Sequence, residues 1–503
     1  MNKDKIYFCI HGHFYQPPRE NPCTDEIDIE YGAAPFHDWN EKIYNECYLP
    51  NSEAGIFNDD HVKLREVNNY CYINFNFGPT LISWIKKNHP DTYFRIIDAD
   101  KKSFASHNGH GNAMAQVYNH IIMPLANDHD KITQIKWGIA DFKSHFSRMP
   151  EGMWLAETAC NQNTIEALIS CGIKYIILDQ SQADSVRDLN GSKWIDVSNG
   201  EVNPKYAYKC FSELDSSKSI NIIFYDGPLS KAAAFEDITK TGESFLNRVE
   251  QSINRIYPEG QLICLATDGE TFGHHKKFSD RTLAYFLTEL AEKNGLYICN
   301  LGEYLESYPP QMAVKIKAGE NNEGTSWSCR HGVKRWRDDC GDSTGGEPGW
   351  KQQWRKPLRN AMNDLRDSLK KTFEEKGSKL FNDVWDARND YIDIILDPSE
   401  NTKMNFFKKH LKSQISEENS KTALKLLEIQ KYSLLMFTSC AWFFSEISGI
   451  ETVQILKYAN VAMEIHRQVT GENLKEDFVN TLAKAKSNIK KYKNGGDVFA
   501  KLV

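Results

Sequence analysis

Three carboxylates lie where strands are expected to end. Glu157 closes the sequence Gly-Met-Trp-Leu-Ala-Glu, and Asp268 and Glu270 directly follow the apolar run 262–266. A short, fully apolar run is typical of a buried parallel strand. Two carboxylates that meet at the mouth of such a sheet can divide the work of splitting a glycosidic bond. This pairing is the main chemical prediction from the sequence.

Asp268 and Glu270 stand two residues apart and would share a face of an extended segment. Like charges at close range raise the pKa of at least one carboxyl group. Acid–base catalysis needs such a difference, because one group must hold its proton while the other stays ionised. We therefore expect a perturbed pKa in this pair.

The first expected strand ends in His11-Gly12-His13, followed by Gln16. Alternate strand residues point to one side, so both imidazoles can face the mouth of the sheet. They could bind a metal, which would need further ligands such as His274 and His275, or hydrogen-bond a polyol. A purely structural role for both histidines is a third interpretation.

A glycine-containing loop at 107–111 precedes Asn112, a suitable helix N-cap. Its glycines match no phosphate-loop spacing. Hydroxyl binding by His110 is the functional interpretation, and simple turn chemistry is the alternative. Another cluster, Cys329, His331 and Cys340, lacks a fourth ligand at a spacing typical of zinc sites, so no metal site is predicted there.

Short apolar runs alternate with helical periodicity up to about residue 305. This alternation predicts a parallel sheet in an α/β fold, as a barrel or a barrel lacking one strand, whose active site lies at the carboxyl ends of the strands. The expected strands are 5–11, 72–77, 134–139, 153–156, 173–178, 221–225, 262–267 and 297–300. The expected helices include 79–88, 111–125, 162–171, 242–257 and 280–294.

A polar stretch rich in glycine and tryptophan, 318–350, interrupts this alternation of strands and helices. Beyond it the pattern is mainly helical, and 402–413 is one of the expected helices. A loop of this length in a compact protein is usually functional or disordered, and its tryptophans favour an ordered one. The predicted organisation is a barrel domain at 1–317, a connecting loop at 318–350 and a helical domain at 351–503.

The composition is that of an ordinary globular protein, with 40% hydrophobic and 26% charged residues among 503. A net charge of −7 argues against a general nucleic-acid binder. We find neither a secretory signal pattern nor a membrane-length apolar window. Twelve scattered cysteines suit free thiols in a reducing compartment, so a cytoplasmic location is expected. The oligomeric state cannot be inferred from these features.

Three ordered motifs, at 11–20, 152–157 and 268–274, resemble those of glycoside hydrolase family 57. The resemblance implies a (β/α)7 incomplete TIM-like barrel with a C-terminal all-α domain, of a subgroup whose helical region has no assigned function. It also implies a retaining mechanism on α-linked glucans or oligosaccharides, with Glu157 as nucleophile, Asp268 as general acid/base and no metal or organic cofactor. The sequence Ser439-Cys440-Ala441-Trp442 is similar to the family's fifth motif, although Ala441 stands where an acidic residue is common.

In this interpretation the sugar is held by residues from several strand ends and by one residue of the helical part. These residues are His11, His13, Gln16, His110, Trp154, Glu270, His274 and Trp442. Two other functions stay open: a metal-dependent carbohydrate deacetylase-like hydrolase that uses His11 and His13, and a catalytically silent glucan-binding protein.

Overall fold

The computed structural model describes residues 5–58, 60–256, 259–412 and 416–502. The chain forms two compact units. The first comprises Met1–Gln16, Ile29–Gln116 and Phe142–Ala318, and the second comprises Pro17–Asp28, Val117–Asp141 and Gly319–Val503. Two short segments from the first third of the chain thus belong to the mainly C-terminal unit.

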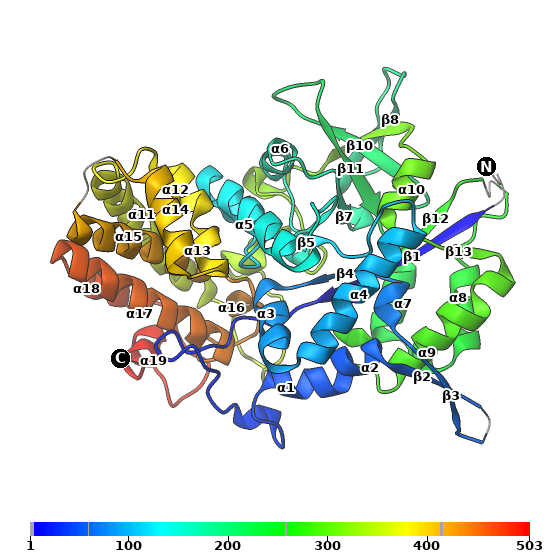
Figure 1. Cartoon of the computed structure of the whole chain (residues 1–503), viewed down its shortest axis with the longest axis horizontal. Coiled ribbons are helices and arrows are strands. Elements are labelled where there is room, and N and C mark those ends of the chain that lie inside the picture. Colours follow the sequence, from blue (N-terminus) through cyan, green and yellow to red (C-terminus); the bar gives the residue numbers. More distant parts are fainter. Residues whose placement is uncertain (1–4, 59, 257–258, 413–415, 503) are drawn as a thin grey trace. The chain divides into compact units, whose positions relative to one another are not determined.

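The first unit is built around strand β1 (Ile6–Phe14), which is buried along almost its whole length. It pairs in parallel with β12 (Leu262–Asp268), β4 (Asn74–Phe77) and β13 (Leu296–Ile298), and Figure 1 shows β1 and β4 running together. Burial on both faces explains the continuous apolar runs 6–10 of β1 and 262–266 of β12. Because the pairing is parallel, the carboxyl ends of β1, β4 and β12 lie at one edge.

Further parallel pairs continue this pattern. Strand β5 (Ala115–Gln116) pairs with β6 (Met153–Trp154), and β7 (Tyr175–Leu178) pairs with β11 (Ser219–Phe224). Four more strands extend this sheet: β10 (Ala207–Phe211), β14 (Met312–Ile316), β8 (Ala183–Asp188) and β9 (Ile195–Asp196). The strand order is β7-β11-β10-β14-β8-β9, in which β10 and β14 pair in parallel and the other added pairs are antiparallel. The unit is therefore an α/β fold with mixed sheets, whereas the sequence predicted parallel strands throughout.

Helices follow most of these strands, and local signals set where they begin. A proline occupies the first turn of α3 (Pro79–Asn88), and the side chains of Asn161 and Thr241 cap α6 (Gln162–Ser170) and α8 (Gly242–Glu250). A hairpin of β2 (Ala54–Phe57) and β3 (Lys63–Val67) is added to the unit. Its helices are α1 (Trp39–Ile43), α2 (Leu49–Ser52), α3 (Pro79–Asn88), α4 (Pro90–Ser106), α6 (Gln162–Ser170), α7 (Gly227–Phe235), α8 (Gly242–Glu250), α9 (Ser279–Tyr285) and α10 (Leu301–Ser307).

Two predicted elements are wrong. The expected strand at 134–139 lies inside helix α5 (Asp128–Phe146), because a short apolar run does not distinguish a strand from a buried helix segment. The expected helix at 111–125 is instead β5 followed by irregular chain and a short 3-10 helix at Met123–Leu125. The predicted helices 242–257 and 402–413 end earlier, and their last residues, 257 and 413, lie outside the described residues.

The second unit is mainly helical. Its long helices α15 and α17 pack against each other, and α11 packs against both. No helix in the described ranges combines the length and the apolar character that a membrane span requires. The helices are α11 (Arg355–Gly377), α12 (Val384–Asp390), α13 (Ile392–Leu396), α14 (Glu400–His410), α15 (Glu417–Leu435), α16 (Cys440–Phe443), α17 (Ile450–Thr470), α18 (Lys475–Leu482) and α19 (Gly495–Ala500).

Candidate active site

The end of β1 carries two imidazoles that stack on one indole. The His11 ring lies 4.7 Å from the Trp154 ring and the His13 ring lies 5.0 Å from it, with interplanar angles of 18° and 25°. Trp154 is fully buried and comes from β6. Trp154 therefore packs against both histidine rings, and its own ring is not exposed to solvent.

Asn76, at the end of β4, holds both histidines. Its side-chain amide lies 3.1 Å from His11 Nε2 and 3.0 Å from His13 Nδ1, and its nitrogen donates to Gln116 Oε1 at 2.8 Å. Burial, together with the neighbouring imidazole in the case of His11, lowers the pKa of both histidines to about 3. Both rings are thus neutral near pH 7, which suits hydrogen bonding to hydroxyl groups.

Glu157 follows β6 on a backbone turn that side chains rarely adopt. Glu157 and the buried Thr158 have φ angles of 58° and 50°, both in the left-handed region. Such strain is unusual for a β-branched residue and is often found at functional sites. Interactions with neighbouring residues must therefore stabilise this backbone conformation.

The side-chain amide of Gln182, a buried residue of the 3-10 helix Gln180–Gln182, holds the turn. Its oxygen accepts hydrogen bonds from Thr158 Oγ1 at 2.8 Å and from Asp179 N at 2.9 Å, and its nitrogen donates to the Thr158 carbonyl at 2.9 Å. The two bonds to Thr158 fix the residue next to Glu157. Neither Gln182 nor Asn76 was singled out from the sequence.

Asp268 ends β12 beside His13, its register partner on β1. One side of Asp268 is exposed to solvent, while protein atoms surround its carboxyl group on the other sides. The loss of water around this carboxyl group, and then the negative charge of Glu157, raise the pKa of Asp268 to about 7. The structure thus brings the Glu157 and Asp268 carboxyl groups within electrostatic range of each other at the ends of their strands.

Glu270 is buried, in contrast to Asp268. Its Oε1 accepts hydrogen bonds from Tyr48 Oη at 2.6 Å and from the Tyr15 amide at 3.1 Å. Desolvation and the nearby Asp268 charge raise the pKa of Glu270 to about 8. Within the pair, the charge of Asp268 acts on Glu270, whereas the like charge that acts on Asp268 is that of Glu157. Gln16 joins the same network by donating to Tyr48 Oη at 3.3 Å, so both residues brace the end of β1.

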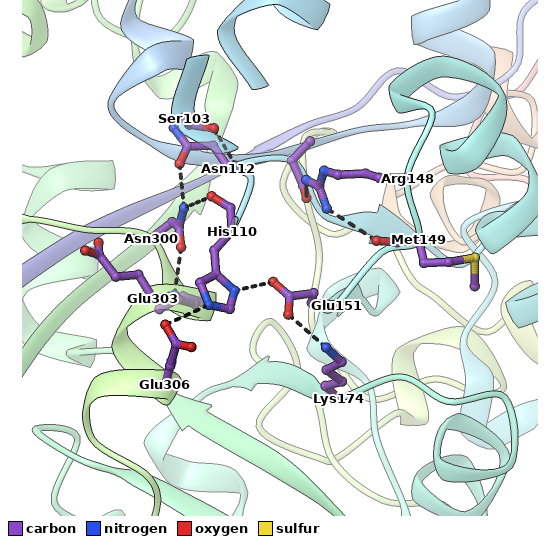
Figure 2. A network of polar contacts seen from close by, with 12 residues as sticks. Ser103, His110, Asn112, Arg148, Met149, Glu151, Lys174, Asn300, Glu303 and Glu306 are labelled. Atoms are coloured by element: carbon purple, nitrogen blue, oxygen red, sulfur yellow. Dashed lines mark hydrogen bonds and ion pairs between the residues drawn. The ribbon is translucent and has the colours of Figure 1, made fainter. Parts of the chain in front are cut away.

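The expectation for His110 needs correction. His110 precedes β5, and its Nδ1 lies 2.7 Å from an oxygen of Glu151, which precedes β6 (Figure 2). Its Nε2 lies 3.4 Å from Glu306. Both ring nitrogens therefore have partners at the amino ends of the strands, whereas Glu157 follows β6 at the opposite end. These contacts with two carboxylates indicate that His110 stabilises its loop, and they do not favour a role in sugar binding.

Two other predicted residues lie in different surroundings. The Nδ1 of His274 contacts a carboxylate oxygen of Glu46. Trp442 belongs to the second unit, where its ring is buried and its Nε1 donates to the Arg355 carbonyl at 3.3 Å. Within that unit Trp442 is a core residue.

The rings of His11 and His13 already have partners in the described residues. Among them, one group alone brings three or more His, Cys, Asp or Glu ligand atoms together, and it lies at 329–342. No third ligand of these types converges on His11 and His13 in the described part of the chain, and Asn76 and Trp154 already engage their rings.

A family model described as glycosyl hydrolase family 57 matches residues 10–317. This match covers more than half of the chain and includes the carboxyl end of β1, Glu157 and Asp268. The chain belongs to glycosyl hydrolase family 57. A second model, a domain of unknown function named DUF3536, matches residues 350–503.

Curated relatives of this family 57 chain include alpha-amylase 1 of Dictyoglomus thermophilum, 24% identical over 257 residues (51% of this chain and 34% of the relative). A 4-alpha-glucanotransferase of Thermococcus litoralis is 20% identical over 293 residues, which are 57% of this chain and 39% of the relative. The matches thus span little more than a third of these relatives' length.

Solved structures share the fold of this family 57 chain. An exo-type maltose-forming amylase from Pyrococcus sp. ST04 has a TM-score of 0.67 at 14% identity, over 98% of this chain and 90% of that one. The alpha-amylase AmyC from Thermotoga maritima has a TM-score of 0.53 at 14% identity, over 99% of both chains. These identities are low, so the likeness concerns the fold.

Proposed function

We propose that this family 57 chain is a retaining enzyme that acts on α-linked glucans or oligosaccharides. The central observation is that Glu157 follows β6 and Asp268 ends β12, where burial and then the charge of Glu157 raise the pKa of Asp268 to about 7. Retaining glycosidases need such a pair, one carboxylate ionised and one carboxyl group protonated. The names of the curated relatives, amylases and glucanotransferases, support the substrate class.

In the proposed reaction a Glu157 oxygen bonds to the anomeric carbon while the bond from that carbon to the leaving oxygen breaks. Asp268 gives its proton to the leaving oxygen. The Asp268 carboxylate then takes a proton from water or from an acceptor hydroxyl, whose oxygen bonds to the anomeric carbon as Glu157 departs. Two inversions restore the original configuration.

The surrounding residues support these two roles. The neutral imidazoles of His11 and His13, fixed by Asn76, can hydrogen-bond sugar hydroxyls beside Asp268. Glu270 and Gln16 hold the end of β1 through Tyr48. Gln182 keeps the strained turn that carries Glu157.

We also propose that residues 1–317 form the catalytic domain as an incomplete (β/α)7 barrel, with 318–350 as a connection and 351–503 as a helical domain. The parallel pairs β12-β1-β4, β5-β6 and β7-β11 support this arrangement. Single parallel bridges, Phe75 with Ala113 and Gly152 with Tyr175, link these pairs in sequence.

The test is product analysis after incubation with starch, glycogen, malto-oligosaccharides and α-galactosides. Wild-type protein should release or transfer sugar with retention of the α-configuration, visible in the first minutes by proton NMR. Glu157→Gln should abolish turnover without changing the circular dichroism spectrum, and Asp268→Asn should lower it strongly. Glu306→Gln, a carboxylate change at the amino ends of the strands, is the matched control.

Activity of Glu157→Gln equal to wild type would refute the assignment. Binding of glucans by the wild type without cleavage or transfer over the whole panel would indicate a silent binding protein instead. Hydrolysis and transfer are distinguished by whether longer oligosaccharides appear.

A further inference from the structure

Four potential metal ligands from the segment between β14 and α11 converge in the second unit. Cys329, His331, Cys340 and Asp342 each offer one ligand atom, and all four atoms lie within 4.8 Å of one another. The sequence pattern lacked a fourth ligand, and Asp342 supplies it because the chain folds back on itself. No residue of this cluster belongs to the proposed catalytic machinery.

Three of the six distances between the ligand atoms are known individually, and they match a tetrahedron around zinc. Cys329 Sγ and Cys340 Sγ lie 3.9 Å apart, Cys340 Sγ and Asp342 Oδ2 lie 3.5 Å apart, and His331 Nδ1 and Asp342 Oδ2 lie 3.6 Å apart. Zinc bonds of about 2.3 Å to sulfur and about 2.1 Å to nitrogen or oxygen give edges of about 3.8, 3.6 and 3.4 Å respectively. The space between the four atoms thus has the size of a zinc ion.

The backbone is shaped to present these ligands in two pairs. Each pair has one intervening residue, Arg330 in the first and Gly341 in the second. Gly341 has a φ of 78°, which glycine adopts without strain and which turns Cys340 and Asp342 toward the cluster. A turn closes the first pair, since the Gly332 amide donates to the Cys329 carbonyl at 3.1 Å.

A buried guanidinium supports the sulfur ligands from outside. Arg355 is fully buried at the start of α11, and its Nη1 lies 3.8 Å from Cys340 Sγ and donates to the Asp342 carbonyl at 2.8 Å. Two thiolates and one carboxylate around Zn²⁺ leave a net negative charge, which a cation in the outer shell offsets. Such outer partners are typical of metal sites.

The loop 319–354 contains little regular secondary structure that could stabilise its conformation. Between Gly319 and Trp354 the described helices are two three-residue 3-10 helices, Glu320–Asn322 and Lys334–Trp336. Long segments without regular structure lose much conformational entropy on ordering. A closed, four-ligand metal site is a common way to stabilise such a segment.

We propose that Cys329, His331, Cys340 and Asp342 bind one structural Zn²⁺ that fastens the loop 319–354 within the helical unit. Two sulfur, one nitrogen and one oxygen ligand in a tetrahedral arrangement suit zinc among the common metals. Binding displaces the two thiol protons to solvent. With four protein ligands the site is closed, so its role is to stabilise the fold.

The full-length protein, produced in zinc-containing medium and dialysed against metal-free buffer, is analysed by inductively coupled plasma mass spectrometry. About one zinc per chain is expected for the wild type. Cys329→Ser and Cys340→Ser should lose most of it, whereas Cys23→Ser, which changes an exposed cysteine elsewhere in the unit, should retain it. No bound metal, iron in place of zinc, or equal zinc in all variants would overturn the proposal.

Two further measurements keep the proposal testable if the serine variants do not fold. Protein produced with cobalt should show the visible absorption of tetrahedral Co²⁺ and sulfur-to-cobalt charge transfer, and Asp342→Cys should strengthen the charge-transfer band by adding a thiolate. An octahedral cobalt spectrum would contradict the site. A Cys329–Cys340 disulfide, detected by peptide mass spectrometry in protein purified under non-oxidising conditions, would also overturn it.

Discussion

The side-chain amide of Gln182 forms two hydrogen bonds with Thr158, the neighbour of Glu157. One joins Thr158 Oγ1 to Gln182 Oε1 and the other joins Gln182 Nε2 to the Thr158 carbonyl. Both Glu157 and Thr158 have left-handed backbone angles. One buried side chain thus holds the strained turn from which the proposed nucleophile projects.

Replacing this amide should impair catalysis more than binding. Gln182→Met has a similar size and cannot make these bonds, so the turn can relax and move the Glu157 carboxylate. We expect kcat to fall by about 10- to 100-fold, because displacements near 1 Å have costs of this order, with a smaller change in KM. Steady-state kinetics on the substrate found by product analysis measures both constants.

The matched control is Gln261→Met. Gln261 is an equally buried amide just before β12, where it hydrogen-bonds the backbone of Asn254 at 2.9 and 3.0 Å. Both variants should lose about 1–3 kcal/mol of stability through unsatisfied buried partners. Only Gln182→Met should lose kcat, and equal kcat losses would show that Gln182 has no positioning role.

The pH dependence should follow the proton on Asp268. Its pKa is raised to about 7, and the first step needs the protonated form, so kcat/KM should fall as the pH rises through about 7. Glu157→Gln removes a negative charge and should lower the pKa of Asp268. Carbon-13 NMR titration of labelled aspartates, with Asp268→Asn to assign the signal, measures this shift. An unchanged pKa would mean that the two carboxyl groups do not interact.

Glu270 should make stability depend on pH. Its folded-state pKa of about 8 lies above the ordinary value of 4.5, so the folded state binds the proton more tightly than the unfolded state. Its contribution to stability therefore falls as the pH rises from about 4.5 to about 8. Glu270→Gln keeps an oxygen that can accept from Tyr48 and Tyr15 but cannot ionise.

The Tm of Glu270→Gln minus the Tm of the wild type should therefore increase as the pH rises, by about 2 °C or more between pH 5 and pH 9. Differential scanning calorimetry at a series of pH values measures the difference. A constant difference would show that Glu270 ionises normally in the folded protein. Glu306→Gln, at an exposed carboxylate, serves again as the control.

Asn76 should govern the charge of the two histidines. Asn76→Asp places a carboxylate beside His11 and His13, and an adjacent negative charge favours the imidazolium form. The pKa of each histidine should rise from about 3. Nitrogen-15 NMR of labelled histidines follows this change. No movement of either pKa would contradict the observed contacts.

Local sequence patterns were sufficient for much of the fold. The apolar run 262–266 predicted a buried strand, and the structure places it in β12. Helix α3 matches its predicted bounds of 79–88, since Pro79 and the apolar spacing both act within one or two turns. The strand at 134–139 failed because six residues of mixed pattern do not report the helix that continues on both sides.

The carboxylates Glu157 and Asp268 were found from the sequence because each follows a strand, and parallel strands bring their carboxyl ends to one edge. The solvent exposure and the hydrogen-bond partners of each carboxyl group could not be predicted in this way. Asp268 and Glu270 are two residues apart, yet the first is exposed and the second is buried beneath Tyr48. His110 and Trp154 also belong to the motifs singled out from the sequence, but His110 contacts Glu151 and Trp154 stacks on the β1 histidines.

The amino-acid sequence alone thus determined the family, most of the parallel strands and the two carboxylates at strand ends, because short-range patterning encodes these features. Only the tertiary structure decided which polar groups meet: Asn76 with the β1 histidines, Gln182 with Thr158, and Asp342 with the two cysteines. These contacts join residues separated by up to 65 positions. Their formation depends on how distant segments pack together, which local composition and spacing do not specify.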